Sequence, residues 1–475
     1  MGSSNTSAWY LDPERCFAPD PTQRMLSGDL FNHVKNLPLI CPHSHIPPSC
    51  IANDSVLGSP SDLFVISDHY VFRMLHSQGI ALEELGIPAK DGCPVEIDHR
   101  QIWQRFSENF HLFSGTPTAL WLKDELINVF GISNQLNGDS GQQIYDELED
   151  KLRQPEFRPR ALFDRFNIEA LCTTDAATDS LEHHDALYQE GWNQLRPTFR
   201  PDSLLNLDTP DWHNNIQLLS SRAGIDICNY RTFVEALKER RVYFKNLGAT
   251  ATDHGARSAY TNFLSENEVQ RIFDRALRLQ DNGNDDTSRF TAHMLLEMAR
   301  MSCDDGLVMQ LHVGSFRNHS TEIFADFGPD MGADIPVSTE WTQSLQTLLN
   351  TFGTDPNFRV IIFTLDETTY SRELAPLAGF YPSVRLGPPW WFFDSVLGIE
   401  RYLDSVVETA GIYNTVGFND DTRAFASIPA RHDVWRRVTS NWIAGRVVRG
   451  LIDEDQAADI AWELAYGLAK RAYRL

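Results

Sequence analysis

Apolar runs that end in polar residues alternate with amphipathic segments along most of the chain. We interpret eight of these runs as strands: 39–45, 170–175, 195–202, 249–255, 307–314, 360–366, 383–391 and 413–421. Short apolar runs bounded by polar residues are typical of strands buried in a parallel sheet. Eight strands that alternate with helices predict an α/β fold of the (β/α)8 TIM-type barrel class.

The stretch between the first two predicted strands has a different pattern. It lacks strand signals and contains helical segments at 68–78, 101–113 and 119–130. The sequence therefore predicts a mainly helical insertion at 50–165, between strands 1 and 2. Because no linker-like segment separates two units, we expect residues 1–475 to form a single domain, a size that barrels with insertions reach.

Local signals mark several helices and one loop. Ser265 and Glu268 form a capping box ahead of an apolar stripe. The last helix begins near Asp453, with acidic residues in its first turn and basic residues at its end, as the helix dipole favours. Another helix is expected at 21–36, and the Asn-, Asp- and Gly-rich segment 280–288 predicts a surface loop.

Residues that can carry chemistry stand at the ends of the predicted strands. In chain order they are His43 and His45, Thr174 and Asp175, Arg200 and Asp202, Asp253 and His254, His312, Asp366, Trp390 and Trp391, and Asp420, Asp421 and Arg423. The carboxyl ends of barrel strands meet at one face, where the active site lies, so we expect these side chains to gather there. Adjacent strand residues face opposite sides. Only one of Trp390 and Trp391 therefore needs to line the site, and both can be core aromatics; we expect Asp420 to point away from the site if Asp421 points in.

The first strand ends in a His-Ser-His motif, His43 to His45. Side chains two apart on a strand share a face, so both imidazoles can reach one cation, and neutral imidazole suits zinc, iron or manganese. The competing interpretation is that two histidines next to prolines only line a turn. The recurrence of polar residues at every strand end favours the metal interpretation, with His312 and Asp421 as partners. One metal then has four ligands, and His254 is expected to be a hydrogen-bonding neighbour instead of a ligand.

Composition narrows the class of protein. The chain has 475 residues, 42% of them apolar and 11% aromatic, which is typical of a globular protein. It contains no apolar stretch of about 20 residues that would cross a bilayer, and its start lacks a secretory signal, so we expect a cytoplasmic protein. The seven cysteines form no CxxC pair and predict reduced thiols instead of a disulfide framework.

The net charge of the chain indicates which kinds of partner it can bind. A formal net charge of −24 argues against nucleic-acid binding, which needs concentrated Lys and Arg. It does not exclude a small anionic substrate, because a few local arginines can hold an anion inside an acidic protein. We therefore expect a small-molecule carboxylate as partner, with no nucleic acid and no membrane; self-association into a homo-oligomer stays open.

Over most of its length the chain resembles the uronate isomerase (glucuronate isomerase) family of the amidohydrolase superfamily. The resemblance follows the strand ends in order. The motifs that carry it are His43-Ser-His45, Asp68-His-Tyr70 with Arg73, Cys172-Thr-Thr-Asp175 with Leu181-Glu-His183, Pro197-Thr-Phe-Arg-Pro-Asp202, Asp253-His-Gly255, Met309-Gln-Leu-His-Val-Gly314 with Arg317-Asn318, Trp390-Trp-Phe392, and Asp421-Thr-Arg423 with Phe425. Each motif is short, but their combined order and spacing are specific.

The resemblance implies an aldose–ketose isomerase that converts hexuronates, glucuronate to fructuronate or galacturonate to tagaturonate, with one divalent metal. That metal is expected to be zinc, with manganese and iron as alternatives. The resemblance also implies site residues: the metal ligands His43, His45, His312 and Asp421, and the sugar-acid contacts Arg200, Arg423, His69, Tyr70 and Trp391.

The chemistry agrees with these roles. Moving a carbonyl from C1 to C2 needs a base for the C2 proton, a cation or donor for the enediolate oxygens, and a positive group for the carboxylate. We expect Asp421 to carry the proton, and Tyr70, Arg423 and His69 to complete the catalytic group. Two arginines, Arg200 and Arg423, would then hold the carboxylate.

Two departures from the family pattern leave other functions open. Leu120 and Lys123 stand where the family commonly has histidines, and the segment 386–389 replaces a Gly-Ser-Gly-like stretch. One alternative is a divergent hydrolase, decarboxylase or lyase that acts on another small carboxylate with the same metal barrel. A second is a non-catalytic binder of sugar acids.

Overall fold

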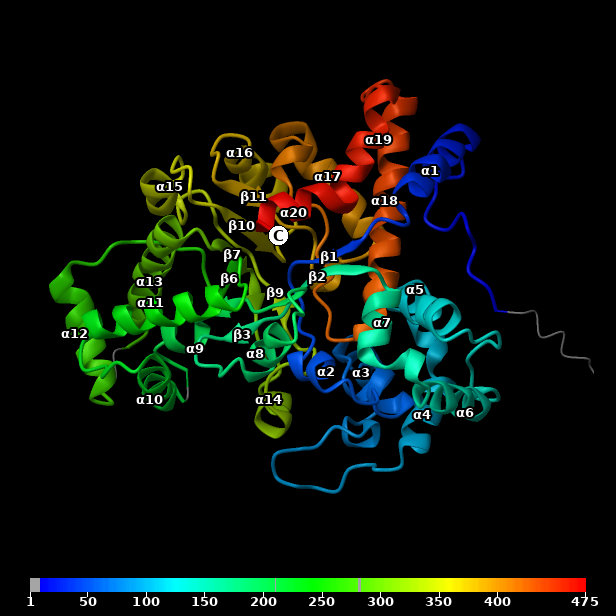
Figure 1. The fold of residues 1–475 in the computed structure, drawn as a ribbon, viewed down its shortest axis with the longest axis horizontal. Coiled ribbons are helices and arrows are strands. Elements are labelled where there is room, and N and C mark those ends of the chain that lie inside the picture. The colour runs from blue at the N-terminus through cyan, green and yellow to red at the C-terminus, as the bar shows by residue number, and fades with distance from the viewer. Residues whose placement is uncertain (1–8, 210, 281–282) are drawn as a thin grey trace, which may run out of the picture.

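The computed structural model describes residues 9–209, 211–280 and 283–475 (Figure 1). Its parallel strands form a three-stranded sheet in the order β1-β2-β4 and a six-stranded sheet in the order β11-β10-β7-β6-β5-β3. Their bounds are β1 Leu39–Cys41, β2 Ile168–Cys172, β3 Asp175–Ala176, β4 Leu195–Arg196, β5 Phe199–Arg200, β6 Ala251–Gly255, β7 Val308–Val313, β10 Val360–Thr364 and β11 Val384–Leu386. A separate antiparallel pair consists of β8 Ser315–Phe316 and β9 Ile335–Pro336. The parallel sheets confirm the predicted α/β class.

The two parallel sheets continue into each other. β2 leads directly into β3, and β4 into β5. The Thr173 N–H donates to the Arg196 carbonyl and the Asp175 N–H to the Thr198 carbonyl, at 2.9 and 3.1 Å, so the ladder crosses from one sheet to the other. Neighbouring strands therefore follow the order of the chain.

The segment after β11 returns to the first strand. A parallel bridge joins Leu386 to Thr415. A few residues later the Asp421 N–H donates to the His43 carbonyl at 3.2 Å, and the His45 N–H donates to the Thr422 carbonyl at 3.0 Å. Residues 415–422 thus hydrogen-bond to β11 on one side and to the extension of β1 on the other.

The central strands are buried along their whole length. Every residue of β7 and β10 is buried, including the apolar runs Val-Met and Val-Ile-Ile-Phe. Strands that are near-continuously apolar are typical of a parallel sheet covered on both faces. Outside the segment between β1 and β2, the α-helices of the described residues are α1 Pro21–Val34, α8 Glu182–Gln189, α9 Asp202–Leu205, α10 Trp212–Ala223, α11 Tyr230–Asn246, α12 Glu266–Leu277, α13 Gly283–Asp305, α14 Thr321–Phe327, α15 Gln346–Phe352, α16 Ala375–Ala378, α17 Val396–Ala410, α18 Ile428–Val448, α19 Glu454–Trp462 and α20 Leu468–Tyr473.

All regular elements between β1 and β2 are helical, as the pattern predicted. They are α2 Pro48–Asn53, α3 His69–His76, α4 His99–Glu108, α5 Pro117–Asp124, α6 Gly141–Leu152 and α7 Pro159–Arg165, with short 3₁₀ and π turns between them. These helices share an apolar core in which Trp103, Phe106 and Phe113 are fully buried. Figure 1 shows most of them in blue and cyan, gathered on the lower right of the strands.

Three sequence predictions were wrong in detail. The loop expected at 280–288 is helical from Gly283, where α13 begins; residues 281 and 282 lie outside the described residues. Asp285 and Asp286 in its first turn suit the positive end of the helix dipole, so the polar cluster marks a helix start. The strand expected at 383–391 ends at Leu386 because two prolines follow that cannot donate to a ladder. Residues 413–421 contribute a single bridge instead of a named strand.

The capping box of α12 is confirmed and supports a stability prediction. Ser265 Oγ accepts from the Glu268 N–H at 3.4 Å, and Glu268 Oε2 accepts from the Ser265 N–H at 3.1 Å. Because Ser265→Ala removes the hydroxyl, we expect the free energy of unfolding to fall by about 1 kcal/mol. Urea unfolding measures this, with Ser405→Ala inside α17 as the control; equal values for wild type and Ser265→Ala would contradict the role of the cap.

No helix within the described ranges is long and apolar enough to cross a membrane. The cysteines, all of which lie in these ranges, form no disulfide.

Candidate active site

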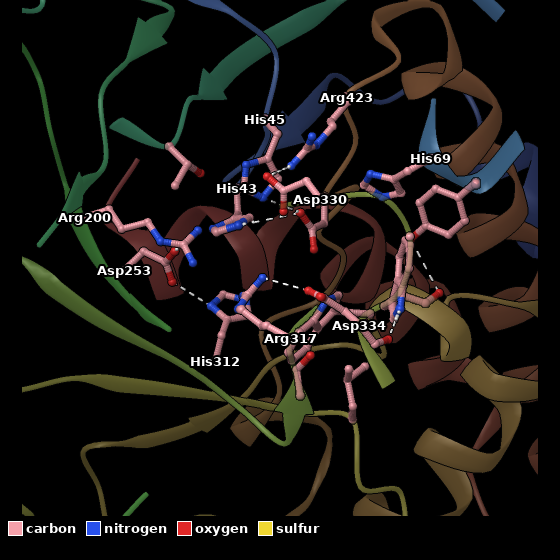
Figure 2. A pocket seen from close by; sticks show the side chains of 18 residues that line it. His43, His45, His69, Arg200, Asp253, His312, Arg317, Asp330, Asp334 and Arg423 are labelled. Carbon is pink, nitrogen blue, oxygen red and sulfur yellow. Dashed lines mark hydrogen bonds and ion pairs between the residues drawn. The ribbon is translucent and has the colours of Figure 1, made fainter. Parts of the chain in front are cut away.

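A cavity of about 260 Å³ lies where the parallel strands end (Figure 2). Every residue to which the family resemblance gave a site role lines it: His43, His45, His69, Tyr70, Arg200, His312, Trp391, Asp421 and Arg423. Of the other strand-end residues expected to gather there, Thr174, Asp253 and Trp390 line the cavity, whereas Asp175, Asp202, His254, Asp366 and Asp420 do not. In Figure 2, Arg200, Asp253 and His312 lie on one side of the cavity and His69 on the other. The roles assigned to these residues remain predictions. The strand topology accounts for the gathering of those at strand ends, whereas His69 and Tyr70 reach the cavity from helix α3.

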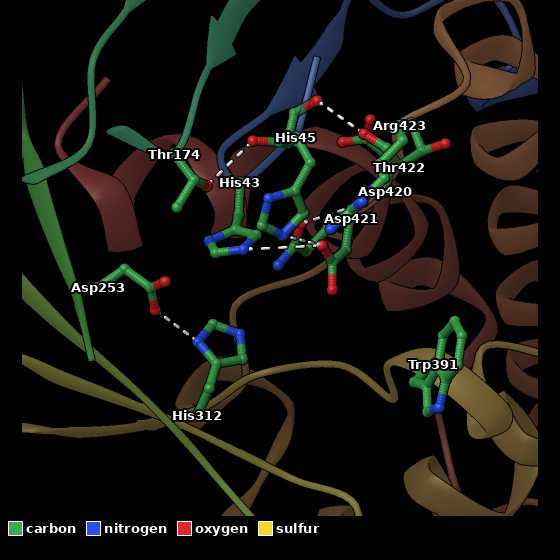
Figure 3. Close-up of polar contacts among 12 residues, drawn as sticks. His43, His45, Thr174, Asp253, His312, Trp391, Asp420, Asp421, Thr422 and Arg423 are labelled. Carbon is green, nitrogen blue, oxygen red and sulfur yellow. Dashed lines mark hydrogen bonds and ion pairs between the residues drawn. The ribbon is translucent and has the colours of Figure 1, made fainter. Parts of the chain in front are cut away.

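His43, His45 and Asp421 converge at the edge where the first and last parallel segments meet. His45 Nε2 lies 3.2 Å and His43 Nε2 lies 3.6 Å from Asp421 Oδ1 (Figure 3). The Asp421 backbone has a φ of +37°, a conformation that is uncommon outside glycine and that favours Asp and Asn among other residues. Its N–H donates to Asn419 Oδ1 at 3.2 Å.

His312, at the end of β7, is held by a carboxylate of β6. Its Nδ1 lies 2.6 Å from Asp253 Oδ1, and its ring stacks on Phe363 with centroids 4.1 Å apart. The other ring nitrogen, Nε2, is buried without a hydrogen-bond partner among the described residues. A histidine that gives one nitrogen to a carboxylate and leaves the other free is the arrangement found at metal ligands.

Two overlapping sets of donors share His43. One is His43, His45 and Asp421; the other is His43, Asp253 and His312; in each set the ligand atoms lie within 4.8 Å of one another. The His43 and His312 ring centroids are 4.8 Å apart. Imidazole and carboxylate donors with free, buried ring nitrogens fit a divalent cation between the two sets.

Burial and neighbouring charges set the protonation of this cluster. Burial lowers the pKa of His43 to about 3, which keeps the imidazole neutral and able to act as a ligand. Burial alone raises the pKa of Asp253, but His312 and Arg200 outweigh it and hold that pKa well below its usual range. Burial likewise opposes ionisation of Asp421, yet the hydrogen bond from His45 and the nearby imidazoles bring its pKa below the usual value.

Three guanidinium groups line the cavity, each paired with carboxylates. Arg200 Nε donates to Asp202 Oδ2 at 2.8 Å, and its Nη1 lies 3.2 Å from Asp253 Oδ2. Arg423 Nη2 lies 2.9 Å from Asp330 Oδ2. Arg317 Nη1 donates to Asp334 Oδ2 at 3.0 Å. The cavity therefore offers three guanidinium groups that an anionic ligand can reach, although the lining carboxylates Asp253, Asp330, Asp334 and Asp421 offset their charge.

The opposite wall is aromatic. The ring centroid of Trp391 lies 4.7 Å from that of Tyr70 and 4.6 Å from that of His69. Burial raises the pKa of the Tyr70 hydroxyl and lowers that of His69 to about 3, so both groups are neutral near pH 7. Behind this wall, the Arg431 guanidinium lies over the Tyr70 ring at 4.9 Å and over the Trp121 ring at 3.7 Å.

The alternation of side chains along a strand required only one of the two tryptophans at the site, and the structure places both there. Both Trp390 and Trp391 line the cavity. Alternation applies only to an extended chain, and here the strand has already ended. Trp391 opens a 3₁₀ turn with a φ of +56°, so consecutive side chains turn toward the same space.

Two strand-end residues next to predicted site residues, His254 and Asp420, lie outside the cavity lining. His254 is buried outside the cavity lining, and its Nε2 lies 3.0 Å from Thr252 Oγ1. Asp420 is buried as well and does not line the cavity.

Four charged residues of the lining had no role assigned from the sequence: Asp253, Arg317, Asp330 and Asp334. Asp253 lies between Thr252 and His254 on β6. Because side chains along a strand alternate between its two faces, Asp253 faces the opposite side from these two neighbours, and this alternation could have identified it. Arg317 lies beyond β7 in one of the quoted motifs. Asp330 and Asp334 belong to the connection between β8 and β9, whose two-residue strands have no detectable periodicity.

The departures at Leu120 and Lys123 lie away from the cavity. Leu120 packs against the main apolar core, and the Lys123 ammonium lies 5.7 Å from the centroid of the Trp9 ring. Neither residue is part of the lining. The cavity therefore keeps its predicted residues although these two positions differ.

Comparisons with known proteins agree over the whole length. The model of the glucuronate isomerase family matches residues 22–473. Uronate isomerase of Nostoc punctiforme is 58% identical over 466 residues, which span 98% of each chain. The crystal structure of glucuronate isomerase from Caulobacter crescentus has 44% identity and a TM-score of 0.96, with 98% of both chains covered. A uronate isomerase structure from Thermotoga maritima has 27% identity and a TM-score of 0.91, covering 98% of this chain and 99% of that one. The chain belongs to the uronate isomerase (glucuronate isomerase) family.

Proposed function

We propose that this enzyme interconverts hexuronate aldoses and ketoses, glucuronate with fructuronate or galacturonate with tagaturonate, in the cavity at the strand ends. The observation that carries the proposal is the family match over residues 22–473 in a chain whose predicted site residues all line one cavity. A divergent hydrolase, decarboxylase or lyase is not favoured, because the positions that depart from the family pattern in the helical region lie outside the lining.

The proposal extends to the closure of the barrel and to the domain organisation. We infer a (β/α)8 barrel closed between residues 415–422 and the extension of β1, in one domain of residues 1–475 with a helical insertion at 50–165. The bridge from Leu386 to Thr415 and the hydrogen bonds from Asp421 and His45 support closure.

His43, His45, His312 and Asp421 would hold one divalent cation, and zinc suits this mixture of imidazole and carboxylate. When bound, the cation would stabilise negative charge that develops on the oxygens of C1 and C2. Two features favour binding of this cation: the His43 imidazole is neutral, and His312 is oriented by its pairing with Asp253.

The chain's own residues would move the protons. In the net reaction a proton leaves C2 and arrives at C1, while the hydroxyl proton passes from O2 to O1. Asp421, ionised near pH 7, would take the C2 proton and return it to C1. Tyr70 and His69, both neutral, would hydrogen-bond the hydroxyl oxygens. The Trp391 ring lies edge-on to both groups, with centroids 4.7 Å from Tyr70 and 4.6 Å from His69.

Arg200 and Arg423 would hold the substrate carboxylate. Arg423 is more accessible, with about a third of its side chain exposed, and its partner Asp330 is a carboxylate that a uronate can replace. Arg200 is fixed from behind by Asp202 and Asp253. A guanidinium binds a carboxylate through two parallel N–H bonds, which lysine cannot reproduce.

We therefore expect Arg200→Lys and Arg423→Lys each to lower kcat/KM by roughly 10- to 100-fold, since one hydrogen bond to a charged group is worth about 1.5–3 kcal/mol. Steady-state kinetics with each uronate measure this. Arg401→Lys, which changes a surface arginine paired with Glu367, serves as the control. Unchanged kinetics in both cavity variants would place the carboxylate elsewhere.

An assay of the purified protein with glucuronate and galacturonate, together with metal analysis, tests the function. Isomerisation of either substrate with bound metal supports it. Bound metal without isomerisation favours the hydrolase, decarboxylase or lyase alternative, and a protein without metal favours a sugar-acid binder.

We further propose a cytoplasmic location, in keeping with seven unpaired cysteines; homo-oligomerisation stays a prediction for a sizing experiment.

A further inference from the structure

A second group of metal-ligating side chains lies outside the cavity lining. It consists of Cys41 on β1, Asp420 in the segment that returns to β1, and His432 on α18. The Cys41 Sγ lies 3.7 Å and the Asp420 Oδ1 lies 4.0 Å from His432 Nε2. The exposed fraction of the three residues is 0%, 0% and 2%. These side chains therefore meet in the interior, away from solvent.

Asp420 lacks the partners that a buried carboxylate needs. Neither of its oxygens makes a hydrogen bond of ordinary geometry within the described chain, and the Cys41 thiol is the side-chain donor beside it. An ionised carboxylate left alone in the interior is strongly unfavourable, so buried charges are paired or coordinate metals. The Arg431 guanidinium, which lies nearby, contacts the Asp420 backbone carbonyl at 3.4 Å and pairs with Asp394 at 2.9 Å.

The spacing fits a small cation. Zinc lies about 2.3 Å from thiolate sulfur and about 2.0–2.2 Å from imidazole nitrogen or carboxylate oxygen, so neighbouring tetrahedral ligands are roughly 3.4–3.6 Å apart. The Sγ–Nε2 separation of 3.7 Å is close to the value for a sulfur and a nitrogen ligand, and the Oδ1–Nε2 separation of 4.0 Å is about 0.6 Å longer than the value for an oxygen and a nitrogen ligand, so the carboxylate would move toward the ion on binding. A thiolate and a carboxylate also supply two negative charges, which a divalent cation neutralises.

We propose that Cys41, Asp420 and His432 bind a second divalent cation, of the zinc class that accepts thiolate and imidazole together. Both oxygens of Asp420 are free to coordinate, which provides four donors from three residues. The closed, buried set of ligands assigns the site a structural role instead of a catalytic one. This inference concerns a different group of residues from the proposed active site and does not depend on the reaction.

The second cation site would fix the two backbone segments that also carry ligands of the proposed active-site metal. Cys41 stands two residues before His43, and Asp420 directly precedes Asp421. The backbone hydrogen bond from Asp421 to the His43 carbonyl already joins these two segments. An ion bound behind them would also tie both to α18 through His432, and so hold two of the proposed cavity ligands in register.

Metal content of the protein purified with zinc tests the inference. We expect two equivalents per chain in the wild type and one in Cys41→Ser and in His432→Asn. His45→Asn, which alters the cavity site, should keep the ion of the second site. Cys172→Ser, a buried cysteine on neighbouring β2 outside the group, is the matched control and should keep both. A wild type with one equivalent, or Cys41→Ser with two, would overturn the proposal.

A spectroscopic measurement on the wild-type protein tests the second cation site even if one of the variants does not fold. Protein loaded with cobalt(II) at both sites should show a thiolate-to-cobalt charge-transfer absorption in the near ultraviolet, because Cys41 would be a ligand. The cavity lining contains no cysteine in the described part of the chain, so the first site cannot produce this signal. Fully loaded protein without the band would mean that Cys41, Asp420 and His432 form a hydrogen-bonded cluster with no metal.

Discussion

Replacing Asp421 by asparagine is expected to lower kcat by roughly 10²–10⁴-fold even when the protein is saturated with metal. Asparagine keeps the shape, one coordinating oxygen and tolerance for a positive φ, which is +37° here, but it cannot accept the C2 proton. Metal affinity should also fall, because a charged ligand becomes neutral while His43 and His45 remain. A metal titration of kcat separates these two effects.

Asp366→Asn is a suitable control for this experiment. Asp366 follows β10 at the same end of the sheet, but it accepts a backbone hydrogen bond from Thr339 at 2.9 Å and does not line the cavity. Its turnover should stay near the wild-type value. If metal-saturated Asp421→Asn also turned over at the wild-type rate, another group would move the proton, and Tyr70 would be the next candidate.

The second large effect is expected for Asp253→Asn. This carboxylate is fully buried and serves two cavity residues, His312 at 2.6 Å and Arg200 at 3.2 Å. Loss of a carboxylate that orients a metal-ligating histidine typically weakens metal binding by about 10- to 100-fold. We expect a weakening of this size, together with poorer binding of the uronate, because Arg200 loses a partner. Competition with a chelating indicator measures the metal affinity.

Asp202→Asn separates these two consequences. Asp202 also pairs with Arg200, at 2.8 Å, but it has no contact with His312. This variant should therefore change the KM of the uronate and leave the metal affinity unchanged. An unaltered metal affinity in Asp253→Asn would contradict the proposed link between this carboxylate and the metal site.

Much of the site was predictable because its residues stand at strand ends. Once the alternation of apolar runs and helices indicates a parallel sheet, the carboxyl ends of the strands must lie at one edge. That rule alone brings His43, His312 and Asp421 together although they are far apart in sequence. Arg200 reaches the same place for the same reason.

The remaining site residues depend on geometry that the pattern does not contain. Asp330 and Asp334 reach the cavity from the irregular chain between helix α14 and the two-residue strand β9, so no period marks which side chains point inward. Trp391 joins Trp390 in the lining through a positive φ. Hydropathy patterns do not predict such single-residue conformations, because they depend on tertiary packing.

The start of helix α13 was also predicted incorrectly from the sequence. The cluster of Asn, Asp and Gly after residue 280 was interpreted as a loop, but much of it forms the first turn of α13. Polar residues of these types suit both a turn and a helix start. Only the tertiary packing of the following apolar residues decides between the two.

The most direct test of the proposed reaction is proton NMR of glucuronate and of galacturonate incubated in D2O with the metal-loaded protein. We predict that the signals of the aldose disappear and those of the corresponding ketose grow, with the C2 proton lost from its original position. The same incubation with Asp421→Asn should leave the substrate almost unchanged. Unchanged spectra for both uronates with the fully metal-loaded wild-type protein would contradict the assignment of hexuronate isomerisation to this cavity.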